Sequence, residues 1–212
     1  MLMITIVLSA CVLLSAGVAI WSDAKGRPRL FRIAKPLTTI LIIVVAALAA
    51  APVPAEYKTL VLAGLMCSLL GDIALAAPKE WFMAGLVAFL AAQIFYMLAF
   101  RPRPGHSVSA GAFLPFVFYG LLMYFLLAPG LGKLKIPVLV YIGAITIMAG
   151  FAAGRFVDLG GTRPFLAFAG AVLFMISDSV LAYDRFGRKI GPAQTIILGT
   201  YFPAQLLIAL SI

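Results

Sequence analysis

Long apolar stretches follow one another along almost the whole chain, separated by short polar or glycine- and proline-rich connectors. Several of these stretches are about 20 residues long, the length that lets an α-helix cross the hydrocarbon core of a bilayer. The pattern predicts eight transmembrane helices, over residues 3–21, 36–52, 57–77, 82–100, 109–128, 134–153, 164–183 and 192–211. No connector is long enough for a soluble domain, so we expect an all-α membrane bundle in which residues 1–212 form a single transmembrane domain.

The first apolar segment has the length of a signal peptide, but no basic residue precedes it and seven more apolar segments follow. We therefore expect residues 1–20 to belong to a first membrane-spanning helix. Cys11 and Cys67 lie in apolar segments without ligand-like spacing, and His106 is the single histidine. The sequence thus supports neither a disulfide nor a metal site, and we expect no cofactor.

Basic residues lie almost entirely between the apolar segments, where membrane topology favours them, so the net charge of +9 does not indicate a nucleic-acid partner. With the N-terminus outside, the inner connectors hold Lys25, Arg27, Arg29, Arg32, Lys35, Lys79, Lys133, Lys135, Arg185, Arg188 and Lys189. The outer connectors hold Lys58, Arg101, Arg103, Arg155 and Arg163. Eleven against five favours both termini outside, and we expect the chain to lie in a bacterial cytoplasmic membrane.

Two aspartates interrupt the apolar segments, Asp72 in the third and Asp178 in the seventh. A carboxyl group inside a bilayer costs several kcal/mol and is by default a functional-site hypothesis. Each acid lies on a face of mostly small residues spaced four apart, which favours close packing inside the bundle. These faces are Gly64, Ser68, Asp72 and Ala76, and Gly170, Phe174, Asp178 and Ala182. The alternative is that the acids only satisfy polar neighbours in the core.

The two acids are 106 residues apart, half the length of the chain, and each begins an Asp-x-x-Leu-Ala sequence. The helix after each acid carries an Ala-Gln pair, at Gln93 and at Gln205. The pattern is either a coincidence among small apolar residues or a repeat of four helices. A repeat in the same orientation would relate the two acids by a pseudo-two-fold axis along the membrane normal.

Further polar side chains lie at comparable depths and are candidate substrate-binding groups. Lys35, just before Pro36 at the expected start of the second helix, is either an ordinary positive-inside charge or a partner of the acids. The tyrosines could instead be anchors at the membrane interface. Asp184 could simply balance the charge of neighbouring arginines, or its basic loop could bind a headgroup phosphate. The other candidates are Gln93, Tyr96, Tyr119, Tyr141, Ser177, Tyr201 and Gln205.

Taken together, these stretches resemble the YhhN-like family, the integral membrane lysoplasmalogenases. The matching residues are Lys35-Pro36, Ser68 to Asp72, Gly85 to Phe89 running to Tyr96, Gly170-Ala171 with Phe174, Ser177-Asp178, and Tyr201 with Ala204-Gln205. Their order and spacing extend over nearly the whole chain. One departure is Gln93, which stands where members often carry a histidine and which cannot titrate.

The resemblance implies hydrolysis of the vinyl ether bond of a lysoplasmalogen, a lysophospholipid, to a fatty aldehyde and glycerophospho-ethanolamine or -choline. Enol ethers hydrolyse by protonation at carbon, and water then attacks the oxocarbenium ion. Asp72 and Asp178 would be the acid–base pair, by the logic of two carboxyl groups in glycoside hydrolysis. The sharpest expectation is geometric: both carboxyl groups should line one cavity that opens towards the cytoplasmic leaflet.

Two other functions compete with this hypothesis. A proton-coupled lipid or solute transporter would also use intramembrane acids and a parallel repeat, although no helix is clearly broken in mid-membrane. The second alternative is a lysophospholipase that cleaves an ester or phosphodiester bond. No Ser/His/Asp set in this sequence supports it, because Gly-x-Ser-x-Gly is absent and His106 lies in a connector.

Overall fold

The computed structural model describes residues 2–50, 53–77, 79–102 and 108–212, and Arg103 and His106 lie outside them. The long helices are α1 (Leu2–Ala24), α2 (Pro28–Leu48), α3 (Ala55–Ala76), α4 (Phe82–Phe100), α5 (Leu114–Leu127), α6 (Lys135–Leu159), α7 (Thr162–Phe186) and α8 (Ala193–Leu210). Short 3₁₀ turns are η1 (Lys79–Trp81), η2 (Ala110–Ala112), η3 (Ala128–Gly130) and η4 (Gly132–Leu134). Within these described residues, eight helical segments are long and apolar enough to cross a membrane, which confirms the predicted all-α membrane bundle.

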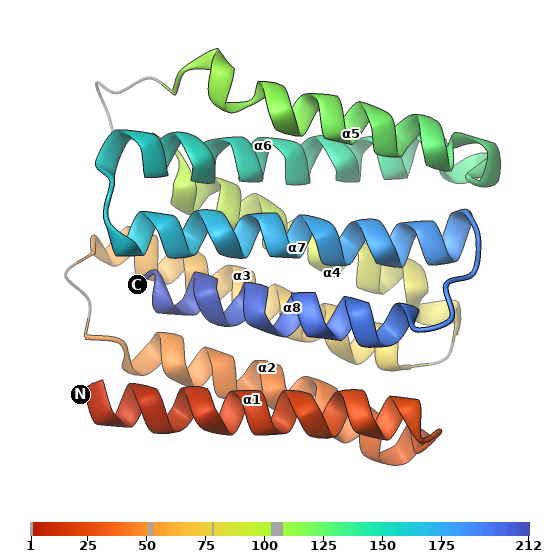
Figure 1. Ribbon diagram of the computed structural model, residues 1–212, viewed down its shortest axis with the longest axis horizontal. Helices are drawn as coiled ribbons and strands as arrows, with labels where there is room; N and C mark the ends of the chain where they lie inside the picture. Colours follow the sequence, from red (N-terminus) through yellow and green to blue (C-terminus); the bar gives the residue numbers. More distant parts are fainter. Residues whose placement is uncertain (1, 51–52, 78, 103–107) are drawn as a thin grey trace.

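Successive helices run in opposite directions, so both termini lie at the same end of the bundle (Figure 1). Helices α1 and α2 form one edge and α5 and α6 the opposite edge. Helix α8 packs against α1, α2, α3 and α7, and it is the most buried of the eight spans. Large apolar side chains on α1 and α5 are exposed, as expected for surfaces that face lipid.

The second helix begins eight residues earlier than the sequence pattern predicts, at Pro28 rather than at Pro36. Pro28 occupies the first helical turn, where a missing backbone N–H costs little, so the polar stretch that follows it is already helical. Pro36 is therefore inside α2 rather than at its start. As a result Lys35 is not a terminal surface charge, and it is only 4% exposed.

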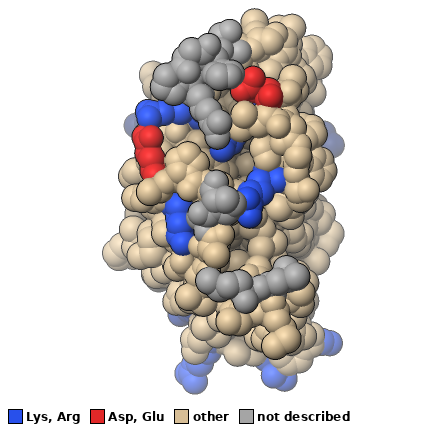
Figure 2. All heavy atoms as spheres, turned by 90° about the vertical axis from the view of Figure 1, so that its left-hand side faces the viewer, with Lys and Arg blue, Asp and Glu red and all other residues tan. Residues whose placement is uncertain are grey.

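The connectors divide between the two ends as the alternating helices require. The end that carries both termini displays scattered basic and acidic side chains among uncharged ones (Figure 2), including a salt bridge between Arg101 and Glu56 at 2.6 Å. The opposite end holds the α1–α2, α3–α4, α5–α6 and α7–α8 connectors, which are richer in Lys and Arg. Which end faces the cytoplasm stays a prediction from this charge difference.

Glycines on α3 allow the close approach of α4. A Cβ atom added to Gly71 would lie 2.6 Å from the ring of Phe89, and one added to Gly64 would overlap the ring of Tyr96. On α7, a Cβ atom at Gly170 would lie 2.8 Å from the backbone oxygen of Ala204 in α8. The small faces predicted from the sequence therefore do point into the bundle.

We predict that Gly71→Ala destabilises the bundle by about 1–3 kcal/mol, because Phe89 is held by neighbouring rings and cannot retreat from a new methyl group. Gly143→Ala is the matched control, since a Cβ atom there meets no other atom within 4 Å. Thermal unfolding of purified protein in detergent measures the difference. Equal melting temperatures for the two variants would contradict the prediction.

Candidate active site

Asp72 lies on α3 and is completely buried. Its Oδ1 atom is 3.2 Å from the ammonium nitrogen of Lys35, while its Oδ2 atom accepts hydrogen bonds from Thr39 at 2.5 Å and from Tyr201 at 2.7 Å. Lys35 and Thr39 are four residues apart on α2 and therefore share one helix face. The Asp72 cluster thus ties α2, α3 and α8 together.

This cluster is an ion pair inside an apolar bundle, where both charges are costly unless they are paired and hydrogen-bonded. The carboxylate of Asp72 has that support from one ammonium group and two hydroxyl groups. Charge-assisted hydrogen bonds of this kind are about twice as strong as neutral ones. The arrangement stabilises the ionised form of Asp72 and leaves it little freedom to move.

Asp178 lies on α7 in different surroundings. Its Oδ2 atom accepts hydrogen bonds from the hydroxyl of Tyr141 on α6 at 2.5 Å and from the amide nitrogen of Gln93 on α4 at 3.1 Å. Both donors are neutral groups. The Asp178 side chain is only partly buried, because it borders a cavity of about 60 Å³.

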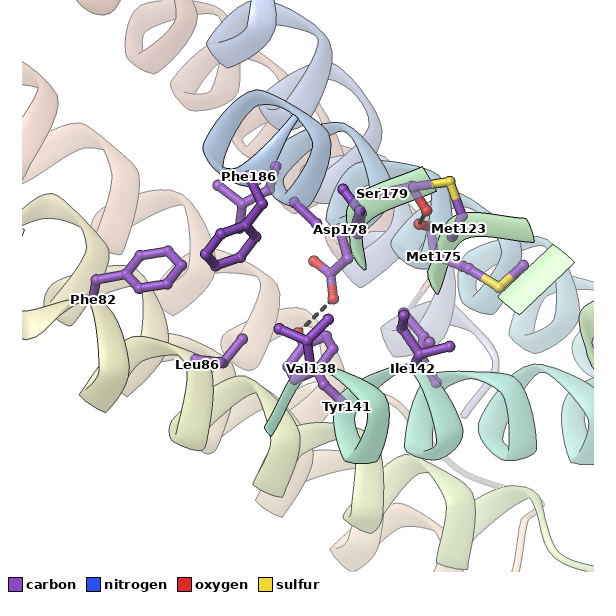
Figure 3. A pocket seen from close by; sticks show the side chains of 14 residues that line it. Phe82, Leu86, Met123, Val138, Tyr141, Ile142, Met175, Asp178, Ser179 and Phe186 are labelled. Atoms are coloured by element: carbon purple, nitrogen blue, oxygen red, sulfur yellow. Dashed lines mark hydrogen bonds between the residues drawn. The ribbon is translucent and has the colours of Figure 1, made fainter. Parts of the chain in front are cut away.

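The cavity next to Asp178 is almost entirely apolar, and its lining comes from α4, α5, α6 and α7. Figure 3 shows the Asp178 carboxyl group with one oxygen bonded to Tyr141 and the other directed into the open space. The side chains that surround this space are Phe82, Leu86, Met123, Leu127, Val138, Ile142, Ile145, Met175, Ser179, Leu181, Ala182 and Phe186. Among the described residues, none donates a hydrogen bond to this second carboxyl oxygen, which faces the apolar cavity.

The expectation that both acids line one cavity is wrong for Asp72. The described lining residues include Asp178 and Tyr141 but not Asp72, because Lys35, Thr39 and Tyr201 occupy the space around it. The helices that carry the two acids, α3 and α7, both pack against α8.

Aromatic rings connect the two acidic clusters. Phe89, Phe174 and Tyr201 form a mutually contacting set, with centroids 5.7 to 6.2 Å apart. Tyr201 binds Asp72 through its hydroxyl group, and Phe174 is one helical turn from Asp178 on α7. The rings join the clusters by packing, without a hydrogen bond between the described groups of the two.

Two predicted binding residues form a third polar cluster instead. The hydroxyl of Tyr96 donates to the side-chain oxygen of Gln205 at 2.7 Å, and the amide nitrogen of Gln205 donates to Ser68 at 2.8 Å. All three side chains are completely buried. They link α3, α4 and α8 one turn away from Asp72, so their contacts are structural and do not include either acid.

The structure does not bring three other predicted residues to the acids. Ser177 donates to the backbone oxygen of Ile197 at 3.2 Å and thereby joins α7 to α8. Asp184 accepts from Lys189 at 2.8 Å and from the backbone N–H of Ile190 at 2.9 Å, which orders the connector after α7. Tyr119 packs against the apolar core from α5 and does not border the cavity.

Sequence reasoning missed Thr39, the shortest hydrogen-bond partner of Asp72. The spacing could have indicated Thr39, because a residue four positions after Lys35 lies on the same face of a helix. Expecting α2 to begin only at Pro36 hid that relation. Gln93 is a second informative case: its side-chain oxygen is buried without a hydrogen-bond partner in the described part of the chain, beside Asp178.

Fold and site define an integral membrane protein whose helical bundle contains two partnered carboxyl groups and an apolar cavity next to one of them. The chain belongs to the YhhN family, whose model matches residues 30–212, so the resemblance seen in the sequence is confirmed. No solved structure matches it.

Several curated relatives are similar to this chain. Human lysoplasmalogenase TMEM86B is 33% identical over 161 residues, which cover 73% of this chain and 64% of the human protein. The mouse protein of that name is 35% identical over 160 residues, covering 74% and 66%. The uncharacterized membrane protein YhhN of Escherichia coli O6:H1 is 29% identical over 202 residues, covering 95% and 96%. The match to the human protein thus spans somewhat less than two thirds of its length.

We predict that Thr39→Val destabilises the protein by about 1–3 kcal/mol, because it removes a hydroxyl donor from a completely buried carboxylate. Thr59→Val is the matched control, since the exposed Thr59 hydroxyl only bonds a carbonyl of its own helix. Denaturant unfolding of both variants in detergent provides the comparison. A loss for Thr59→Val as large as that for Thr39→Val would refute the assigned role.

Proposed function

We propose that this protein is a lysoplasmalogenase, which hydrolyses the vinyl ether bond of a lysophospholipid within the membrane. The observation that carries the proposal is Asp178, a partly buried carboxyl group that faces an apolar cavity between transmembrane helices. The names of the mammalian relatives support the same activity. The alkenyl chain of such a lipid suits an apolar cavity, and its headgroup suits the nearby end of the bundle with its basic connectors.

The reaction needs a proton donor at carbon. The donor transfers its proton to the second carbon of the alkenyl chain, and the first carbon then shares the positive charge with the ether oxygen. Water adds to that first carbon and loses a proton to a base. The resulting hemiacetal loses the proton of its hydroxyl group as its bond to the glycerol oxygen breaks, and the glycerol oxygen takes up a proton. The products are a fatty aldehyde and glycerophospho-ethanolamine or -choline.

Asp178 is the proposed proton donor, because it borders the cavity and its partners Tyr141 and Gln93 are neutral. Both partners bond the same oxygen, so the other oxygen is available to carry a proton towards the substrate. Once deprotonated, the Asp178 carboxylate can accept the proton of the attacking water. Its two hydrogen bonds would hold it in place through both steps.

Asp72 has the complementary role in this proposal. The ammonium group of Lys35 favours its ionised form, so it is a poor proton donor. Its carboxylate holds Lys35 and Tyr201 in place, and the ring of Tyr201 packs on Phe174, one helical turn from Asp178. The acid–base pair expected from the sequence thus becomes a division of roles, in which Asp178 exchanges protons and Asp72 positions its neighbours.

We predict that Asp178→Asn lowers aldehyde release by at least about 10³-fold, because the donor is lost while the hydrogen-bonding shape is kept. Asp158→Asn, at an exposed position near the end of α6, is the control and should keep full activity. The assay uses purified protein with lysoplasmenyl-ethanolamine and quantifies aldehyde. Full activity of Asp178→Asn would overturn the mechanism, and a proton-coupled transporter would release no aldehyde even as wild type.

We predict a different result for Asp72→Asn. Replacing the carboxylate leaves the ammonium of Lys35 buried and unpaired, so stability should fall by about 3–5 kcal/mol. Where the variant remains folded at low temperature, it should retain measurable activity, unlike Asp178→Asn. Thermal unfolding and aldehyde release on the same preparation test both parts, and complete inactivity of well-folded Asp72→Asn would contradict the positioning role.

Protonation at carbon also predicts an isotope pattern. In D₂O the aldehyde should carry one deuterium on the carbon next to the carbonyl group, provided that it is reduced to the alcohol at once to prevent exchange. Mass spectrometry of the alcohol measures this. A product without deuterium at that carbon would exclude the proposed protonation step.

A further inference from the structure

Two aromatic rings line the cavity at the basic end of the bundle. Phe82 begins α4 and Phe186 ends α7, and both line the cavity (Figure 3). Their ring centroids are 6.1 Å apart in an edge-to-face arrangement. The guanidinium carbon of Arg185 lies 4.6 Å from the centroid of the Phe82 ring. One cation therefore rests on a ring that lines the cavity.

Arg185 is an exposed cation that none of the salt bridges among the described residues engages. The adjacent carboxylate, Asp184, bonds Lys189 and the backbone N–H of Ile190 instead. The contact of Arg185 with an aromatic face at an exposed site is weak, whereas a guanidinium group binds phosphate through paired, charge-assisted hydrogen bonds. A phosphate group would thus compete successfully with Phe82 for Arg185.

The spacing between Arg185 and Asp178 fits the length of a lysophospholipid. The two residues are seven apart on α7, which places them on the same helix face and separates them by about 10 Å along the axis. In the lipid, five covalent bonds separate the ether oxygen from the phosphorus, a span of about 6 Å. The long Arg185 side chain can cover the remainder, so a phosphate at Arg185 leaves the vinyl ether near Asp178.

The two rings, Phe82 and Phe186, differ in how their backbones are packed. The backbone of Gly130, in the connector between α5 and α6, packs so closely on Phe186 that a Cβ atom there would overlap its backbone oxygen. The end of α7 is thus packed against the connector between α5 and α6. Phe82, by contrast, follows the short turn η1 directly. Opening therefore involves displacement of Phe82 rather than of Phe186.

From these contacts we propose that Arg185 is the residue that binds the phosphate of the substrate, and that its transfer from Phe82 to this phosphate opens the cavity. Arg185 is then a specificity-determining residue that distinguishes phosphate-bearing lysolipids from neutral alkenylglycerols. This inference rests on the proposed function for its substrate, but its binding test below does not require catalysis.

The kinetic test compares two substrates that differ only in the headgroup, lysoplasmenyl-ethanolamine and 1-alkenylglycerol. Arg185→Gln should raise KM for the phosphate-bearing lipid about tenfold, with kcat within about twofold, and leave the neutral lipid unchanged. Arg29→Gln removes an exposed charge at the same end of the bundle and should change neither. Equal effects of Arg185→Gln on both substrates, or none on either, would overturn the proposal.

The binding test uses saturated 1-alkyl analogues, which cannot be hydrolysed in this way, with and without the phosphoethanolamine headgroup. Calorimetry in detergent should give about tenfold weaker binding of the phosphate-bearing analogue to Arg185→Gln than to wild type or Arg29→Gln. Such a result would support the Arg185 site even if wild type released no aldehyde, a failure of the proposed function alone. Phosphatidylglycerol vesicles that abolish the difference would instead assign Arg185 to phosphates of the surrounding bilayer.

Discussion

The ion pair between Lys35 and Asp72 is the interaction that most constrains this bundle. Two charges inside an apolar assembly are tolerated only when each is compensated, and this requirement brings specific donors from α2 and α8 to one point on α3. Thr39 and Tyr201 donate hydrogen bonds to this carboxylate, and without them its Oδ2 atom would be buried without these two donors, at a cost in stability. One buried carboxylate thus joins α2, α3 and α8 at a single point.

The surroundings of Asp178 have the same plan with different chemistry. Asp72 draws its partners from the helix before it, α2, and from α8, whereas Asp178 draws them from the helix before it, α6, and from α4. Lys35 and Tyr141 are 106 residues apart, as are the two acids. This correspondence agrees with the hypothesis of a parallel four-helix repeat. Asp72 contacts the ammonium group of Lys35, whereas Asp178 contacts the phenol of Tyr141 at the corresponding position.

Sequence patterns predicted the helices and the faces that carry the acids, because both depend on local periodicity. The start of α2 was misplaced, because Pro28 and Pro36 are equally good signals for a helix start and the polar residues between them look like a connector. Thr39 was lost with it. Residue type and depth in the membrane did not distinguish the hydroxyl groups that bind an acid, those of Tyr141 and Tyr201, from those of Tyr119 and Ser177. The packing of helices distant in sequence decides which hydroxyl group contacts a carboxylate.

In the proposed mechanism, the difference between the two halves separates the role of Asp72 from that of Asp178. A carboxylate paired with an ammonium group gains stability from its charge, and it would have to give up that pairing in order to donate a proton. A carboxyl group held by a phenol and an amide has no such counter-charge in contact, so gaining or losing a proton leaves its hydrogen bonds intact. Asp178, the acid of this second kind, also borders an apolar cavity lined by α4, α5, α6 and α7. Under the proposed function, the presence of a phenol in one half where the other half has an ammonium group is thus what leaves Asp178 free to exchange a proton while Asp72 stays paired.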